Sequence, residues 1–79
     1  MPKIRIETKP IAGPYDGYYN PADALAWCST TMAQESNRLL AQGSIKKIIS
    51  TSHAITSDTN NKGERTYTPS VIITYEQHH

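Results

Sequence analysis

The stretch NPADALAWCSTTMAQESNRLLAQG, residues 20–43, decides the fold of this chain. Asn20 is typical of an N-cap, Pro21 suits the first helical position, and Asp23 puts a negative charge at the positive end of the helix dipole. Gly43 is expected to end the helix in the left-handed conformation. The stretch therefore predicts one long amphipathic helix over residues 21–42.

The predicted helix has one apolar stripe when its residues are placed at about 100° intervals. We expect this stripe to face the core; it consists of Leu25, Cys28, Met32, Ser36 and Leu39, flanked by Ala22, Ala33 and Leu40. Trp27 falls on nearly the opposite side, in line with Thr31, Gln34 and Arg38. The single tryptophan is therefore expected to point away from the core, toward a neighbouring subunit or a ligand.

Three strands are expected around this helix. Alternation in residues 3–9, with Ile4 and Ile6 on one face and the charged side chains on the other, predicts a first strand that Pro10 ends. A tyrosine-rich loop follows at residues 11–19. Residues 44–56 are rich in β-branched side chains and predict a second strand, residues 57–65 a turn, and residues 66–76 a third strand. Pro69 cannot donate a ladder hydrogen bond, so we expect it at an edge or a bulge.

These elements predict a single α+β domain over residues 1–79. Its order is β-α-β-β, with one long helix on a three-stranded, mainly antiparallel sheet. One helix covers only one face of such a sheet, and a chain of 79 residues has room for only a small core. A homo-oligomer is therefore expected.

Composition argues against several classes of partner. The formal net charge is +1 and charged residues make up 19%, so binding to DNA, RNA or an acidic membrane through bulk charge is not expected. No segment approaches the roughly 20 apolar residues that cross a bilayer, and residues 1–6 lack the apolar core of a signal peptide. Cys28 is the only cysteine and is expected to be a buried small hydrophobe. A cytoplasmic location follows, the host cytoplasm if the chain is phage-encoded.

No catalytic constellation is visible in the sequence. His53 is the only internal histidine and lies among Ser and Thr in the second predicted strand, where pairing with a hydroxyl is the simpler interpretation. Phosphate loops, nucleophile elbows and metal-ligand spacings are missing from the sequence. We expect no enzyme activity, no catalytic residues, no metal and no cofactor.

The sequence does contain groups that suit a nucleotide-like ligand. Aromatic rings can stack on a base, guanidinium groups can bind phosphate, and hydroxyls can bind sugar oxygens. The candidate ligand-binding residues are Tyr18, Tyr19, Trp27, Arg38, Thr51 and Arg65. Trp27 and Arg38 are three helical turns apart, so one ligand would touch both only if two subunits packed these helices together.

The stretch from Ile45 to Glu76 contains Ile-Lys-Lys-Ile-Ile-Ser-Thr-Ser, a turn, and Tyr-Thr-Pro-Ser-Val-Ile-Ile-Thr-Tyr-Glu. It resembles the small sporulation proteins of spore-forming bacteria, where a β-α-β-β unit closes on a similar aliphatic-x-Tyr-Glu strand. It also resembles the Thoeris anti-defence sponge proteins of phages. That resemblance implies sequestration of a cyclic nucleotide signal, without cleavage, in pockets between subunits. This chain is shorter and has the tyrosine-rich loop, and the family's ligand residues do not match it one by one.

Three functional hypotheses follow. The first is an oligomeric anti-defence protein that sequesters a cyclic nucleotide or cyclic ADP-ribose-like immune signal. The second is a small inhibitor or accessory protein that acts by protein-protein contact through Trp27 and the tyrosine-rich loop. The third is a flavin store, because the order of elements is also similar to that of dodecin. Dodecin-like proteins stack flavin on a tryptophan in a strand, whereas Trp27 lies in the predicted helix.

Overall fold

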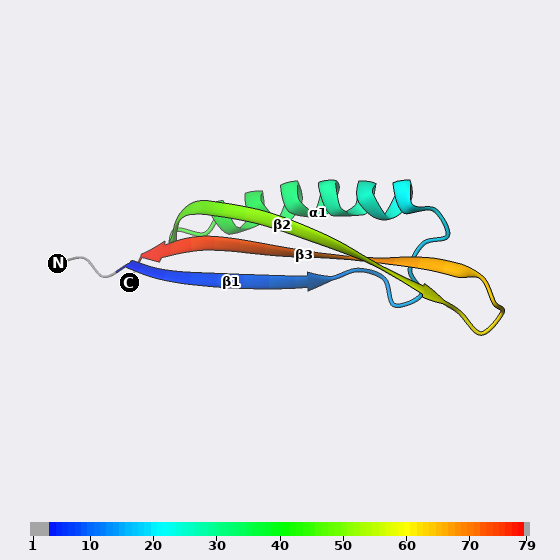
Figure 1. Ribbon diagram of the computed structural model, residues 1–79. Coiled ribbons are helices and arrows are strands. Elements are labelled where there is room, and N and C mark those ends of the chain that lie inside the picture. Colours follow the sequence, from blue (N-terminus) through cyan, green and yellow to red (C-terminus); the bar gives the residue numbers. More distant parts are fainter. Residues whose placement is uncertain (1–3, 79) are drawn as a thin grey trace.

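The computed structural model describes residues 4–78, which form one helix and three strands (Figure 1). In chain order these are β1 (Ile4–Ala12), α1 (Pro21–Leu40), β2 (Ile45–Thr59) and β3 (Arg65–His78). All strand pairs are antiparallel. The predicted α+β fold, with a three-stranded antiparallel sheet and one helix, is confirmed.

The last strand lies in the middle of the sheet, whose order is β1-β3-β2. Val71 of β3 lies opposite Ile11 of β1 and opposite His53 of β2. Two irregularities in the β2–β3 register fall between Ile45 and Lys47 and between Ile48 and Ser50. Beyond them β2 pairs regularly as far as Thr59, three residues past the predicted end of this strand.

Two prolines take positions that the sequence analysis did not expect. Pro10 does not end β1, which continues to Ala12. Pro69 lies in the central strand and is almost fully buried, not at an edge. Its carbonyl accepts a hydrogen bond from the Gly13 amide at 2.9 Å, so the backbone polar groups of Pro69 point to the β1 side. Gly13, to which these groups point, is the residue directly after the end of β1. Because an N–H at position 69 would point away from β2, its absence in Pro69 removes no hydrogen bond between β3 and β2.

The start of α1 agrees with the prediction and its end does not. The Asn20 side chain accepts a hydrogen bond from the Ala22 amide at 2.8 Å, and Pro21 is the first helical residue. The helix ends at Leu40, and Ala41 caps it in the right-handed conformation. Gly43 is not among the positive-φ glycines, which are Gly17 and Gly63. The prediction that Gly43 ends the helix in the left-handed conformation is wrong.

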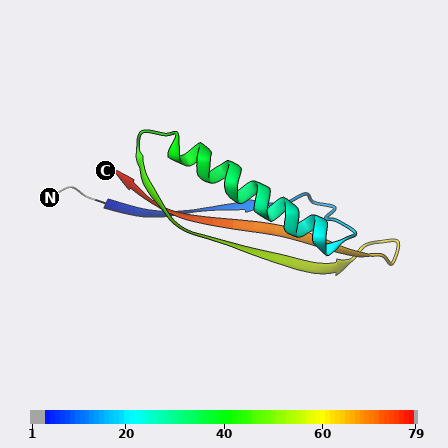
Figure 2. The ribbon, with the colours of Figure 1, turned by 90° about the horizontal axis from the view of Figure 1, so that it is seen from above.

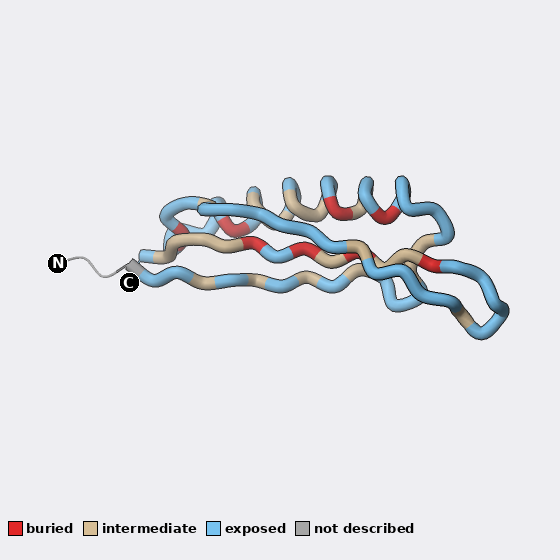
Figure 3. The backbone as a smooth tube through the Cα atoms, in the orientation of Figure 1, coloured by how far each residue is buried: buried red, intermediate tan, exposed pale blue. Residues whose placement is uncertain are grey.

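The core lies between α1 and one face of the sheet (Figures 2 and 3). Its buried residues come from the helix, from the start of β2 and above all from the centre of β3: Ala24, Cys28, Leu39, Ile45, Pro69, Val71 and Ile73. Trp27 and Met32 pack against this cluster from either side of the buried helix face. The prediction that Trp27 points away from the core is therefore wrong.

The buried face of the helix is rotated from the expected stripe by roughly half the angle between successive residues, toward Trp27. Leu25 and Leu40, which were expected in or beside the core, are each 50% exposed. Small side chains explain the rotation, because Ala24 and Cys28 let the helix approach β3 closely while larger residues fill the flanks. The prediction that Cys28 is buried is confirmed, and its thiol lies 3.9 Å from the Ser70 carbonyl oxygen.

The faces of β1 are also inverted relative to the simple hydrophobic pattern. Lys9 lies on the helix side, where its ammonium group is 3.5 Å from a carboxylate oxygen of Glu35. The side chain of Ile6 points to the opposite face of the sheet from Lys9, where it is 59% exposed. The helix side of β1 thus carries Lys9 and Ile11, which packs against the core, and the uncovered face carries an isoleucine.

The molecule is long for its size. The radius of gyration of its Cα atoms is 15.4 Å, against about 12 Å for a compact domain of this length. Its principal extents are 56 × 16 × 15 Å, because two strands of fourteen and fifteen residues run along the whole body. Within the described residues, no helix is long and apolar enough to span a membrane.

Candidate functional site

The loop between β1 and α1 lies against the first residues of β3, near Tyr67 and Pro69. A turn closes at its tip with a 3.0 Å hydrogen bond from the Gly17 amide to the Pro14 carbonyl. Directly after the turn, Tyr18 and Tyr67 exchange backbone hydrogen bonds of 2.8 and 2.7 Å. The loop therefore leaves the sheet at Gly13 and returns to it at Tyr18, with Tyr15 and Asp16 exposed between these two attachments.

Two glycines make this close approach possible. A side chain at Gly13 would place its Cβ 2.6 Å from the Pro69 carbonyl oxygen. At Gly17, which has a φ of +69°, the Cβ would lie 2.9 Å from the Tyr67 carbonyl oxygen. Both positions need glycine because the loop backbone touches the β3 backbone there.

The turn between β2 and β3 is built around Asn60. Its side-chain oxygen accepts hydrogen bonds from the amides of Lys62 and Glu64, each at 2.9 Å. Its backbone amide donates to the Glu64 carbonyl at 2.8 Å, and Gly63 adopts a φ of +78°. These hydrogen bonds hold the turn in one conformation at the end of the sheet.

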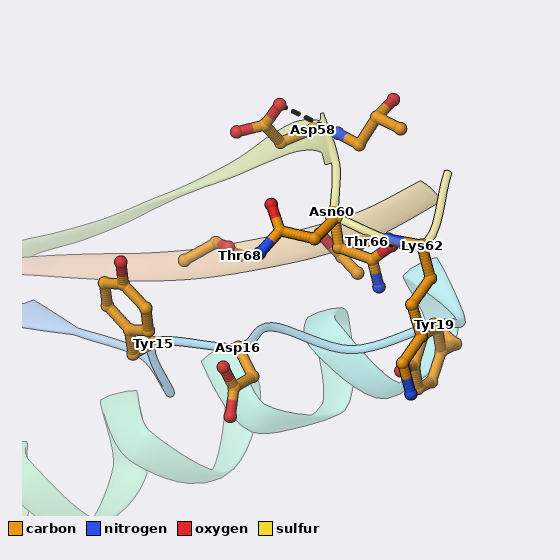
Figure 4. A pocket seen from close by; sticks show the side chains of 10 residues that line it. Tyr15, Asp16, Tyr19, Asp58, Asn60, Lys62, Thr66 and Thr68 are labelled. Atoms are coloured by element: carbon orange, nitrogen blue, oxygen red, sulfur yellow. Dashed lines mark hydrogen bonds between the residues drawn. The ribbon is translucent and has the colours of Figure 1, made fainter. Parts of the chain in front are cut away.

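A hollow of about 560 Å³ lies between the β1–α1 loop and the β2–β3 turn (Figure 4). It is shallow and open to solvent. The residues that line it come from the loop, from the turn and from the uncovered face of the sheet: Tyr15, Asp16, Tyr19, Asp58, Thr59, Asn60, Asn61, Lys62, Thr66 and Thr68. Figure 4 shows Tyr15 on one side of Asp16 and Tyr19 on the other.

The chemistry of the hollow is mainly that of neutral hydrogen-bonding groups. Threonine hydroxyls and asparagine amides supply donors and acceptors, and Tyr15 and Tyr19 are 99% and 67% exposed, so their rings are accessible. The charged lining groups are the carboxylates of Asp16 and Asp58 and the ammonium of Lys62. Such a lining suits a ring that stacks and hydroxyls that donate to carboxylates better than it suits several phosphates.

The structure brings only some of the six candidate ligand residues to this end of the molecule. Tyr19 lines the hollow, and Tyr18 is the half-buried residue that anchors the loop to Tyr67. Arg65 begins β3 next to the turn, where its guanidinium donates to the Ser57 hydroxyl at 3.0 Å.

The other three candidates lie elsewhere on the fold. Trp27 packs against the core, and Thr51 is exposed in the middle of β2. Arg38 is in the last turn of α1, 3.4 Å from a carboxylate oxygen of Glu35. Within one copy of the chain, these three residues do not join the hollow.

Sequence reasoning missed most of the lining. The stretch Asp58 to Lys62 was read only as a hairpin connection, and Thr66 and Thr68 only as strand residues. The available signal was the pair Asn60 and Asn61 facing a tyrosine-rich loop, but the spatial meeting of the two loops depends on β1 pairing with β3 and not with β2.

No metal-binding group of three or more His, Cys, Asp or Glu side chains occurs among residues 4–78. His53 is exposed on β2, and Cys28 is buried in the core. Neither residue lines the hollow.

Comparison of the chain with models of protein families, with curated proteins and with solved structures gives no match.

Proposed function

We propose that this protein binds a nucleotide-type ligand in the hollow and releases it unchanged. The observation that carries the proposal is the pair of exposed tyrosine rings beside a wall of hydroxyl and amide groups. A planar base can stack on Tyr19 or Tyr15, and base edges can hydrogen-bond to Asn61 or Thr68.

The charges of the hollow indicate which part of the ligand it holds. A carboxylate is a good acceptor for the hydroxyls of a ribose, as in dinucleotide-binding sites. Asp16 and Asp58 can take that role, while Lys62 is the one lining cation for a phosphate. The nucleoside portion of the ligand would therefore lie in the hollow and its phosphates near Lys62 and Arg65.

The ligand class that we propose is a cyclic nucleotide or cyclic ADP-ribose-like signal whose nucleoside portion enters the hollow while its phosphates stay outside, on the side of Lys62 and Arg65. The resemblance of residues 45–76 to anti-defence sponges supports the same class. Sequestration requires affinity alone, which agrees with a site made of stacking and hydrogen-bonding groups. The Trp27 ring has no part in this proposal, because it packs against the core.

A thermal-shift panel tests the proposal. The purified protein is screened against nucleosides, mononucleotides, cyclic di- and trinucleotides, cyclic ADP-ribose isomers and flavin. A ligand that binds only the folded state stabilises it by about 2.7 kcal/mol at a hundredfold excess over its Kd. We expect a selective rise in melting temperature with one cyclic signal, and chromatography of the released ligand should show it intact.

Matched variants locate the site. Tyr19→Ala and Thr68→Val should weaken binding about tenfold or more, because each removes a lining group. Thr74→Val is the control, since Thr74 is a half-buried threonine on the same face of β3 but outside the hollow. Equal loss from Thr68→Val and Thr74→Val, or a panel without any shift, would refute the proposal.

Protein-protein contact is the second candidate function. Leu25 and Leu40 are half exposed on the outer surface of α1, where they could anchor a partner protein. A panel without any shift would favour this candidate, with the two leucines replacing Trp27 as the expected anchors.

A further inference from the structure

Strand β2 has an outer edge to which no strand pairs in the described part of the chain. This edge is long, because β2 spans fifteen residues. Figure 2 shows that β2 crosses the other two strands near its start and then runs along one side of the molecule, beside the helix. An exposed strand edge presents unpaired N–H and C=O groups to which another strand can pair.

The backbone direction identifies the groups on this edge. The polar groups of Pro69 point toward β1, as its bond from Gly13 shows, and directions alternate along a strand. The neighbouring residues Ser70 and Ile72 therefore point toward β2, where their partners are Ala54 and Ser52. The alternate residues of β2 then direct their backbone groups to the free edge: Thr51, His53, Ile55 and Ser57.

The two irregularities of β2 lie before Ser50 and its lysines lie at positions 46 and 47, so only the part of the strand between them and Asp58 lacks the devices that normally protect an edge. From Ile48 to Ser57 it contains ten residues without Lys, Arg, Asp, Glu, Gly or Pro. Most of these side chains are Ile, Thr or Ser and are exposed. Such a segment has high β-propensity and nothing that repels a second strand.

The opposite edge of the sheet is protected. β1 carries Arg5, Glu7 and Lys9, and its Pro10 lies opposite Ile72. Since Ile72 directs its backbone groups to β2, Pro10 faces outward, and the N–H that it lacks would have been on the free edge. Because only one of its two sheet edges can accept another strand, the chain can form a closed pair but not a filament.

We propose that a second copy of this chain pairs with β2, antiparallel to it, to give a continuous six-stranded sheet across a twofold axis. The charges of β2 complement such a partner. Lys46 and Lys47 lie at one end of the strand and Asp58 at the other, so antiparallel pairing brings the lysines of each copy near Asp58 of its partner. This register places Ser52 close to its own counterpart at the centre.

The pairing completes the hollow. Asp58 lines it, and in a single copy Lys46 and Lys47 lie at the far end of β2 with their ammonium groups 3.9 and 3.8 Å from Glu76. In the dimer the two lysines of one copy stand beside the hollow of the other and add cations to a site that has only Lys62. The inference of the dimer itself is independent of the proposed ligand.

Sedimentation equilibrium over a concentration series tests the dimer. We expect a mass of twice 8.8 kDa for the unmodified chain. His53→Pro removes an outward N–H and leaves the bonds to β3 in place, so it should shift the protein to monomer and raise the dimer Kd about tenfold or more. Circular dichroism and melting of the same sample show that this variant keeps its fold.

A charge exchange at Ser52 gives an independent test that needs no proline. Ser52 is exposed, so a charged side chain there is compatible with the folded monomer. Ser52→Lys and Ser52→Asp should each be monomeric because like charges meet at the twofold axis, and an equimolar mixture should restore the dimer. A monomeric unmodified protein, or a dimer that His53→Pro and both Ser52 variants leave intact, would overturn the proposal.

Discussion

At the scale of single residues, glycine has different roles at different positions of this chain. Gly13 and Gly17 lie where the loop backbone touches β3, and Gly63 has a positive φ in open space. Gly43 has neither a close neighbour nor a positive φ. Comparing these four positions therefore distinguishes the effect of a steric clash from the effect of a positive φ.

Substitution of Gly17, Gly63 and Gly43 by alanine should give a graded series of stabilities. We expect Gly17→Ala to lower the free energy of unfolding by about 1–3 kcal/mol, because it adds a clash to an unfavourable φ. Gly63→Ala should cost about 1 kcal/mol from its φ alone. Gly43→Ala should be neutral or stabilise by up to about 1 kcal/mol. Denaturant unfolding measures the series, and a Gly43→Ala as harmful as Gly17→Ala would contradict this account.

The candidate residues show what the sequence reveals about a site. Tyr19 was recognised because three tyrosines within the nine-residue loop at residues 11–19 are uncommon. Thr68 and Asn60 were not recognised, since threonine in a strand and asparagine in a turn are ordinary residues. They line the hollow only because β1 pairs with β3, which places the loop opposite the turn.

At the scale of elements, the order and type of all four were predictable, while the direction in which two of them face was not. The helix is weakly amphipathic, and the choice between a face with Leu25 and a face with Trp27 depends on how closely Ala24 and Cys28 approach β3. The facing of β1 follows its register with β3, which puts Lys9 opposite Ile73 and Ile11 opposite Val71. Long-range packing decided both cases, and no pattern within either segment records it.

The orientation of α1 predicts a contrast between two helix substitutions. Trp27→Ala should lower the free energy of unfolding by about 2 kcal/mol or more, because Trp27 packs against the core. Leu25→Ala should cost less than about 1 kcal/mol, since Leu25 is half exposed. Thermal or denaturant unfolding of both variants measures the difference. Equal costs would show that the buried face of the helix is centred as the hydrophobic stripe alone suggests.

At the scale of the whole molecule, association was expected from the sequence because one helix covers only one face of the sheet and the core of so short a chain is small. The molecule's length of 56 Å comes from strands that extend beyond the helix. Counting apolar residues indicates that such a chain has a small core, but it does not identify a surface to which a second copy would bind. The free edge of β2 became visible only from the strand order, which puts the last strand in the centre.

Amide hydrogen exchange should show this arrangement directly. We expect the slowest exchange at Val71 and Ile73, in the buried centre of β3. The amides of Thr51, His53 and Ile55 point to the free edge and should exchange quickly in dilute protein, then slow as concentration rises. Ser52 is the internal control, because its amide faces β3 at every concentration. Uniformly slow exchange along β2 at low concentration would contradict the expected free edge.

From the central position of β3 we expect a particular order of events as the chain folds. β2 and β3 are joined by a tight turn and can zip together within microseconds, as hairpins do. β1 pairs only with β3, and its register joins Ile11 to Val71 across most of the chain. The entropy of closing this long loop must be met before any of its contacts form. We therefore expect β1, the first strand along the chain, to be the last strand to pair.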